Sequence, residues 1–191
     1  MKLSRLAVLM LFSAGPALAG ARVNGHDYPD LQSALDAAQD GDTVTLAPGT
    51  THEAGVVRQN RLILAGKGAH LNGVAAEGKA ALVIKGNDVT VMGLECSGIS
   101  VGGGNGACIR AEGTNLTLDG VYFHDSEEGL LSGGKSGRIE VRNSRFERLG
   151  AARSFSATAG LAFRDTDERG NATSPIYQRA AFGNLFENWD S

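Results

Sequence analysis

A short pattern that recurs four times constrains the fold more than any other feature of this chain. In each copy an alternating apolar segment is followed within two residues by glycine or asparagine, and the copies start 27, 27 and 23 residues apart. The four segments are Leu62–Leu64, Val89–Val91, Leu116–Leu118 and Ile139–Val141. Repeats of this length indicate stacked structural units. Apolar residues at every second position indicate that each unit contains a β-strand.

Glycine and asparagine tolerate a positive φ angle, so they can turn the chain at the end of each strand. These corner residues are Gly66, Gly93, Gly120 and Asn143. Three residues beyond the last three corners lie Cys96, Phe123 and Phe146, which we expect to form a column inside the stack. Met92, Asp119 and Arg142 should form an outward column. We therefore predict an all-β fold, a right-handed, single-stranded parallel β-helix.

A short helix is predicted before the first strand. Asp30 can cap a helix that begins near Leu31. The apolar residues of this segment, Leu31, Ala34, Leu35 and Ala38, fall on one helical face. The first turn of a stack has no neighbour above it, so we expect this face to cover the N-terminal end of the core.

Three stretches resemble the pectate-lyase-like right-handed β-helix superfamily, over about residues 30–150. They are LQSALDAAQDGDTVTLAPGT, VYFHDSEEGLLSG and RIEVRNSRFERLG. This superfamily includes polysaccharide lyases, alginate epimerases and many members of unknown activity. The resemblance implies a protein that binds or acts on polysaccharide. Because a long groove needs many turns, the short repeat array favours a non-catalytic member. The alternative is a Ca²⁺-dependent lyase or C5-epimerase that acts on an acidic polysaccharide.

The chain divides into three segments. Residues 1–19 have the features of a signal peptide: basic Lys2 and Arg5, an apolar run from Leu6, and a small-residue cleavage signal before Gly20. The rival interpretation is a membrane anchor, but the run is shorter than the roughly 20 residues that a span requires. We expect the mature protein to be secreted or periplasmic. Residues 20–150 form the β-helix, and residues 151–191 form an irregular C-terminal segment with a candidate partial last turn near 182–188.

Charge narrows the range of partners. The chain has 18 basic side chains, of which Lys2 and Arg5 belong to the leader, and 21 acidic ones, so the mature protein has a net charge of −5. This charge disfavours nucleic acid, whose binding depends on neutralising phosphates. No second long apolar run follows residue 19, so no membrane insertion is expected after the leader is removed. A neutral sugar, or an anionic one at a local basic patch, stays open.

The densest polar cluster is His124–Glu128, directly after a predicted strand. The candidate catalytic residues are Glu127, Glu128, Arg142 and Arg145, and the candidate substrate-binding residues are Asp119, His124 and Asp125. Carboxylates in a turn suit Ca²⁺, although no metal ligand set is assigned. The simpler alternative is a solvated corner whose Asp125 bonds the backbone. Across adjacent turns, Asp119 and Arg142 are expected to form an exposed ion pair.

Cys96 and Cys108 are the only cysteines of the chain. An exported protein can join them in a disulfide. Alternatively, each serves as a small buried apolar residue in the stacked core.

Overall fold

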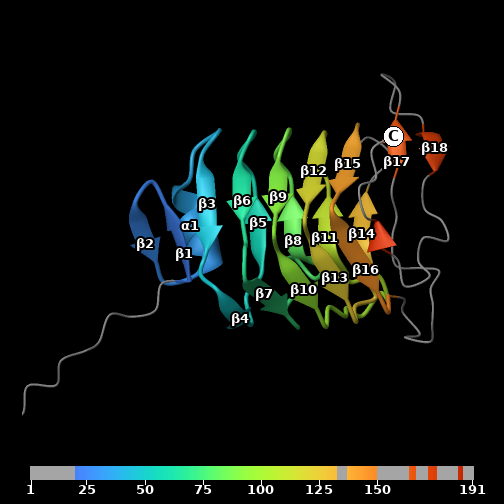
Figure 1. Cartoon of the computed structure of the whole chain (residues 1–191), viewed down its shortest axis with the longest axis horizontal. Coiled ribbons are helices and arrows are strands. Elements are labelled where there is room, and N and C mark those ends of the chain that lie inside the picture. The colour runs from blue at the N-terminus through green and yellow to red at the C-terminus, as the bar shows by residue number, and fades with distance from the viewer. Residues whose placement is uncertain (1–19, 133–136, 150–163, 167–171, 176–184, 187–191) are drawn as a thin grey trace, which may run out of the picture.

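The computed structural model describes residues 20–132 and 137–149, and the backbone of short strands at 164–166, 172–175 and 185–186. In these residues the chain coils into a stack of turns, and each turn adds one strand to each of three sheets (Figure 1). The predicted signal peptide, 1–19, and most of the segment 151–191 lie outside the described residues.

The three sheets run along the stack. The first sheet has the order β15 (Ile139–Arg142), β12 (Leu116–Asp119), β9 (Thr90–Met92), β6 (Ile63–Ala65), β3 (Thr43–Leu46), β1 (Ala21–Val23) and β2 (His26–Tyr28). The second has the order β19 (Leu185–Phe186), β16 (Ser144–Glu147), β13 (Tyr122–His124), β10 (Glu95–Ser97), β7 (Ala69–Asn72) and β4 (Gly49–Thr51). The third has the order β14 (Glu128–Ser132), β11 (Ala107–Ala111), β8 (Ala80–Ile84) and β5 (Gly55–Val57). The backbones of β17 (Arg164–Thr166) and β18 (Ala172–Pro175) pair with each other.

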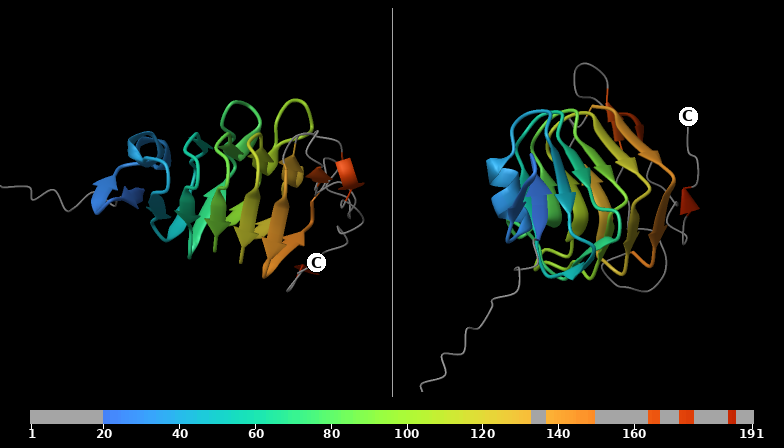
Figure 2. Two further views of the ribbon diagram at one scale, coloured as in Figure 1. Left: turned by 90° about the horizontal axis from the view of Figure 1, so that it is seen from above. Right: turned by 60° about the vertical axis from the view of Figure 1, so that its left-hand side comes forward.

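The strand pairing confirms the predicted parallel β-helix. From β3 to β16 every pair within the three sheets is parallel, and each strand pairs with the equivalent strand of the next turn. The predicted apolar column is in register and almost fully buried, with the members Leu64, Val91, Leu118 and Val141. The second predicted column, Cys96, Phe123 and Phe146, is also in register and buried. The right-hand view in Figure 2, which looks obliquely along the stack, shows the turns lying behind one another.

Three of the four predicted corners have the expected backbone. The φ angles of Gly93, Gly120 and Asn143 are 67°, 65° and 50°. The prediction is wrong for Gly66, whose φ is not positive. Glycine fits this position for a different reason: a Cβ atom there would lie 3.0 Å from Leu94 Cδ1. At this corner a side chain would be in tight contact with Leu94 of the next turn, which would have to shift.

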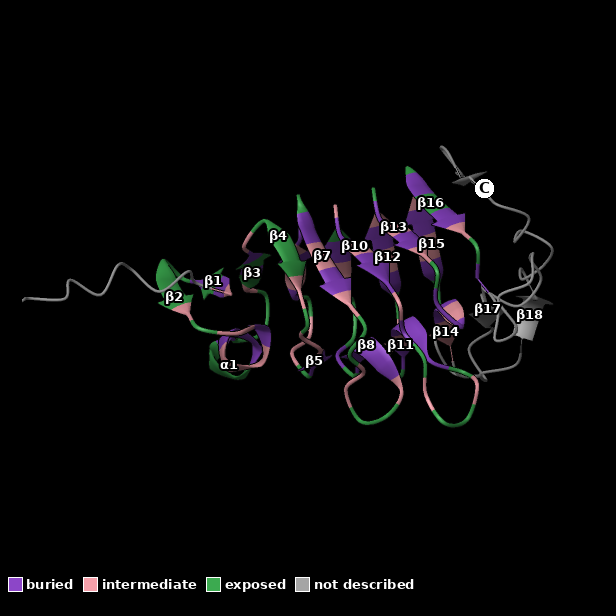
Figure 3. Ribbon diagram, turned by 90° about the horizontal axis from the view of Figure 1, so that it is seen from below, coloured by how far each residue is buried: buried purple, intermediate pink, exposed green. Residues whose placement is uncertain are grey.

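The predicted helix is also confirmed. Helix α1 (Leu31–Ala37) is capped by Asp30, whose side chain accepts a hydrogen bond of 2.7 Å from the backbone N–H of Ser33. All four residues of the predicted apolar face are buried. The helix contacts β1, β3 and β5 at the N-terminal end of the stack, where Figure 3 shows exposed residues on its outer side. It therefore covers one end of the core.

A hairpin completes this end. The residues preceding α1 form β1 and β2, which pair antiparallel, and β1 also pairs antiparallel with β3. Asn24 and Gly25 connect them with φ angles of 51° and 79°, as a two-residue type I′ turn requires. The sequence predicted no strands at these positions. The hairpin covers the edge of the first sheet, which would otherwise present unpaired backbone groups.

An asparagine ladder supports the corner that precedes the first sheet. The Oδ1 atoms of Asn60, Asn87 and Asn115 accept hydrogen bonds of 3.0–3.2 Å from backbone N–H groups of the following turn. Repeated side-chain amides thus satisfy backbone donors that the turn leaves without a strand partner. These polar residues have a structural role.

The two cysteines form a disulfide inside the stack. Cys96 on β10 and Cys108 on β11 have Cα atoms 5.8 Å apart and are both buried. Of the two alternatives, the structure shows the covalent one, and the pair joins the second sheet to the third.

At the other end of the stack, β19 pairs antiparallel with β16. A further turn of the β-helix would pair parallel, so this strand differs from the preceding turns. Among the described residues, no helix is long and apolar enough to cross a membrane.

Candidate functional site

The outer side of the second sheet carries a continuous polar surface. Strand alternation turns Leu71, Cys96 and Phe123 inward, and therefore turns their neighbours on β7, β10 and β13 outward. We call this surface the histidine face. It consists of His70, Asn72, Glu95, Ser97, Tyr122, His124, Arg145 and Glu147.

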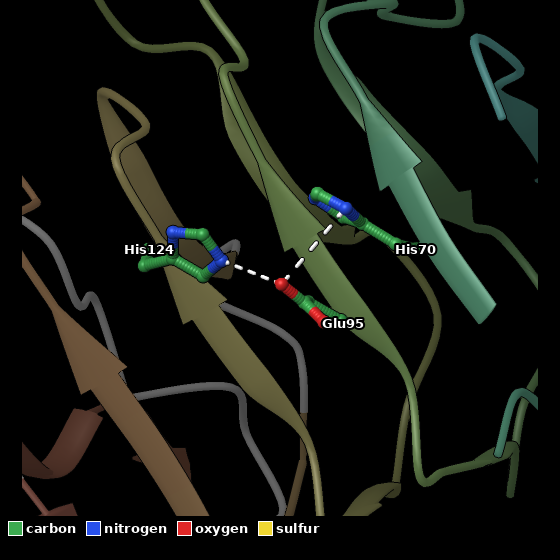
Figure 4. Close-up of side chains that lie close together, drawn as sticks. All are labelled: His70, Glu95 and His124. Carbon is green, nitrogen blue, oxygen red and sulfur yellow. Dashed lines mark hydrogen bonds and ion pairs between the residues drawn. The ribbon is translucent and has the colours of Figure 1, made fainter. Parts of the chain in front are cut away.

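Three side chains from consecutive turns converge at its centre (Figure 4). Glu95 Oε1 lies 3.0 Å from His124 Nε2 and 3.9 Å from His70 Nδ1. One ligand atom from each of the three residues lies within 4.8 Å of the others. The two imidazoles are mostly covered, whereas the Glu95 side chain is 41% exposed. This arrangement could hold a metal ion, and a solvent-borne molecule could reach it.

Further polar groups fix both imidazoles. His70 Nε2 lies 2.7 Å from Ser97 Oγ, which also accepts a hydrogen bond from Asn72. His124 Nδ1 lies 2.6 Å from Asp125 Oδ2. Arg148 donates to both oxygens of the Asp125 carboxylate at 2.7 Å. These bonds from Arg148, and secondarily the one from His124, hold the pKa of Asp125 well below its usual range.

An aromatic stack lies beside this centre. The Tyr122 ring stacks on His124 with centroids 4.2 Å apart, and the Arg145 guanidinium lies 5.1 Å from the centroid of the same ring. The Tyr122 hydroxyl donates a 2.7 Å hydrogen bond to Glu147. Burial, together with this bond, raises the pKa of Tyr122, so the hydroxyl keeps its proton. Arg145 also pairs with Glu147, so the cations of this face already have anionic partners.

Glu127 organises a loop. Its carboxylate accepts hydrogen bonds from Ser100 Oγ at 2.7 Å, from the Val101 N–H at 3.0 Å and from the Gly106 N–H at 2.7 Å. The side chain is buried under the 98–106 connection between β10 and β11, one of the loops that project from the stack in Figure 2. A carboxylate held in this way is structural.

Glu128 has a different environment. It begins β14 on the third sheet, in register with Ala107 and, one turn further, with Ala80. Its Oε2 atom is buried and has no hydrogen-bond partner among the described residues. Burial, and secondarily the nearby negative charge of Glu127, raises the pKa of Glu128 to about 7. Such a carboxyl can accept or donate a proton near neutral pH.

Asp119 and Arg142 lie on the first sheet. They are in register on β12 and β15, as predicted, but the expected ion pair between them is wrong. Arg142 pairs instead with Glu140, two residues earlier on the same strand face, at 3.1 Å. Asp119 accepts a hydrogen bond of 3.0 Å from Asn143 Nδ2.

The predicted site residues therefore lie in four places. His124, Asp125 and Arg145 come together at or beside the histidine face, and Glu128 belongs to the third sheet. Asp119 and Arg142 lie on the first sheet, and Glu127 lies under the 98–106 connection. The chain turns at Asp125, with a φ of 49°, and this corner separates the residues of the predicted cluster. His70 and Glu95 were not predicted as partners of His124. Counting positions from each corner would have placed them on adjacent turns.

Comparison of the chain with protein-family models, with curated proteins and with solved structures finds no match. The fold is therefore assigned from its own strand topology, as a parallel β-helix of about four turns.

Proposed function

We propose that this protein is exported and binds polysaccharide along the histidine face, as a member of the pectate-lyase-like superfamily. The observation that carries the proposal is a row of hydrogen-bonding side chains on four consecutive strands, β7, β10, β13 and β16. Adjacent strands are about 4.8 Å apart, so the row presents donors and acceptors at regular intervals along the stack. A chain of linked sugars offers hydroxyl groups that repeat in the same way.

The charges of this face favour a sugar chain with few charges. Arg145 on this face pairs with Glu147, and Arg148 beside it pairs with both Glu147 and Asp125. An acidic polysaccharide would have to displace these partners, and the net charge of the mature chain opposes it. We therefore infer a neutral polysaccharide as the preferred ligand.

Affinity electrophoresis tests this proposal. The mature protein is run through native gels that contain a neutral polysaccharide, such as a soluble glucan or mannan, or an acidic one, such as pectate or alginate. We expect the neutral polymers to retard the protein. Asn72→Ala and Arg145→Ala should weaken this retardation, because they remove polar groups from two different turns of the face.

A matched variant on another outer face is the control. Arg142→Ala removes an arginine from the outside of the first sheet and should leave the retardation unchanged. The assignment to the histidine face would be refuted if Arg142→Ala weakened the retardation as much as Asn72→Ala and Arg145→Ala do. It would also be refuted if no polymer retarded the unaltered protein.

The second candidate is the Ca²⁺-dependent lyase or C5-epimerase, and the proton-exchanging carboxyl of Glu128 is the observation that favours it. Incubation with pectate or alginate and Ca²⁺ tests it. An unsaturated product, detected by ultraviolet absorbance, would show β-elimination, and proton NMR of the polymer would show epimerisation. Loss of either activity in Glu128→Gln would assign the base.

A further inference from the structure

The convergence of His70, Glu95 and His124 has a consequence beyond polysaccharide binding. We propose that the histidine face binds one divalent transition-metal ion, such as Zn²⁺, through His70 Nδ1, a Glu95 carboxylate oxygen and His124 Nε2. The three ligands come from β7, β10 and β13, which are neighbours in one rigid sheet (Figure 4).

The distances suit a metal ion of this size. Zn²⁺ binds nitrogen and oxygen at about 2.0–2.2 Å, so two ligand atoms of a tetrahedral site lie about 3.4 Å apart. The observed separations from Glu95 Oε1, 3.0 Å to His124 and 3.9 Å to His70, lie on either side of this value. The ligand atoms of the two histidines lie within 4.8 Å of each other, so metal binding requires the side chains to move closer together. Thr50 Oγ1, 3.3 Å from His70 Nδ1, makes a long contact that the metal would replace.

The surrounding hydrogen bonds have the pattern that supports metal-binding histidines. Such a histidine usually donates the N–H of its second ring nitrogen to a carboxylate or another acceptor, and this hydrogen bond fixes the orientation and the tautomer of the ring. His124 does so with Asp125, which Arg148 holds in turn. The second nitrogen of His70 contacts the Ser97 hydroxyl. In each ring, the nitrogen nearer Glu95 is then the one whose lone pair can bind a metal.

His124 provides an independent argument. Each of its two nitrogens faces a carboxylate oxygen, Asp125 at 2.6 Å and Glu95 at 3.0 Å. A neutral imidazole has only one N–H to donate. These contacts are stabilised by nearby positive charge. Arg148 Nη2, 3.4 Å from His124 Nδ1, supplies it on the Asp125 side, and a cation between Nε2 and Glu95 would supply it on the other. A metal ion at that position would satisfy His124, Glu95 and His70 together.

The donor set determines which metals fit. Two imidazoles and one carboxylate suit Zn²⁺ and its transition-metal neighbours, whereas Ca²⁺ takes six to eight oxygen ligands. Three protein ligands leave at least one position open, and the exposure of Glu95 places that position toward solvent. Water, or a hydroxyl group of a bound sugar, could occupy it.

Metal titration of the mature protein tests the inference without any polysaccharide, so its result is independent of the proposal above. The protein carries no polyhistidine tag and is first stripped with a chelator. We expect calorimetry to give one Zn²⁺ per chain and no competition by Ca²⁺. We also expect Co²⁺ to produce the visible absorption of a tetrahedral site.

Variants locate the site. His70→Ala, Glu95→Gln and His124→Ala should each abolish measurable Zn²⁺ binding, and Asp125→Asn should weaken it by about 10- to 100-fold. His52→Ala removes an exposed histidine directly after β4, outside the proposed ligand set, and should bind as the unaltered protein does. Circular dichroism checks the fold of each variant. If an alanine variant unfolds, Zn²⁺ binding by Glu95→Gln, whose side chain has nearly the same shape, tests the site instead.

Two outcomes would overturn the inference. One is the absence of Zn²⁺ binding at micromolar concentrations in the unaltered protein. The other is unchanged stoichiometry and affinity in folded Glu95→Gln, which would place any bound metal elsewhere.

Discussion

The buried carboxyl of Glu128 makes the stability of this protein depend on pH in a specific direction. With its pKa raised to about 7 from the ordinary value of 4.5, Glu128 holds a proton in the folded state that the unfolded chain has already released. Between these two pH values the native state binds more protons, so the free energy of unfolding falls as pH rises. Below about pH 4.5 both states are protonated, and above about pH 7 both are ionised.

The magnitude follows from the same difference. A tenfold change in proton affinity corresponds to about 1.4 kcal/mol, so the full difference would be worth about 3 kcal/mol. Glu128 is only partly buried, and solvent screening reduces this value. We therefore expect about 1–2 kcal/mol of stability to be lost between pH 5 and pH 8 through this one group.

Glu128→Gln isolates the effect, because glutamine keeps the size of the side chain and cannot ionise. Urea unfolding of both proteins, followed by circular dichroism at several pH values from 5 to 8, gives the difference in unfolding free energy. We expect the unfolding free energy of the variant, relative to that of the unaltered protein, to be about 1–2 kcal/mol higher at pH 8 than at pH 5.

A second glutamate provides the control. Glu112→Gln removes an exposed carboxyl directly after β11, which pairs with Lys79, and shows what the same substitution does outside the buried position. A difference between Glu128→Gln and the unaltered protein that does not change with pH would refute the reasoning. It would show that the carboxyl titrates alike in the folded and unfolded chains.

Two further predictions concern the core and a loop. Reduction of the Cys96–Cys108 disulfide should lower the free energy of unfolding by about 3 kcal/mol in urea melts, because the bond closes a loop with a sequence separation of 12. A Cys96→Ser, Cys108→Ser variant should then be insensitive to reductant. Glu127→Gln should cost about 1–3 kcal/mol, because the amide turns an N–H₂ group toward backbone donors. Faster hydrogen exchange within residues 98–106, with no change in α1, would locate its effect.

The repeat could be predicted because its signal lies in contiguous residues. An apolar alternation followed by a corner residue fixes both the inward side of a strand and its end, and register follows when successive copies are aligned. The N-terminal hairpin had an equally local signal, Asn24–Gly25 between two short strands, whose significance as a type I′ turn was missed. The Gly66 corner could not be predicted from its residue type, because its cause is the approach of Leu94 from the next turn.

The candidate site was harder to predict, for a physical reason. Metal motifs in helices and loops are recognised by short spacings, but the separations here are 25 residues between His70 and Glu95 and 29 between Glu95 and His124. In a β-helix, residues one turn apart are neighbours. Conversely, residues adjacent in sequence separate at a corner, as Asp125 and Glu128 do. In such a fold, two residues lie close together when they occupy similar positions in adjacent turns.

The same geometry explains why chemistry can gather on one outer face. Inward positions are constrained by a shared core, whereas outward positions can change without disturbing it. On the third sheet the outer residues, among them Val56, Ala80 and Ala107, pack in an apolar cluster of their own. On the first sheet the outer charges of β15 pair along the strand, as Glu140 and Arg142 do. The second sheet differs, because its outward histidines and carboxylates pair across turns and thus meet at strand spacing. Side chains at that spacing can share one ligand, which is why both proposals concern this face.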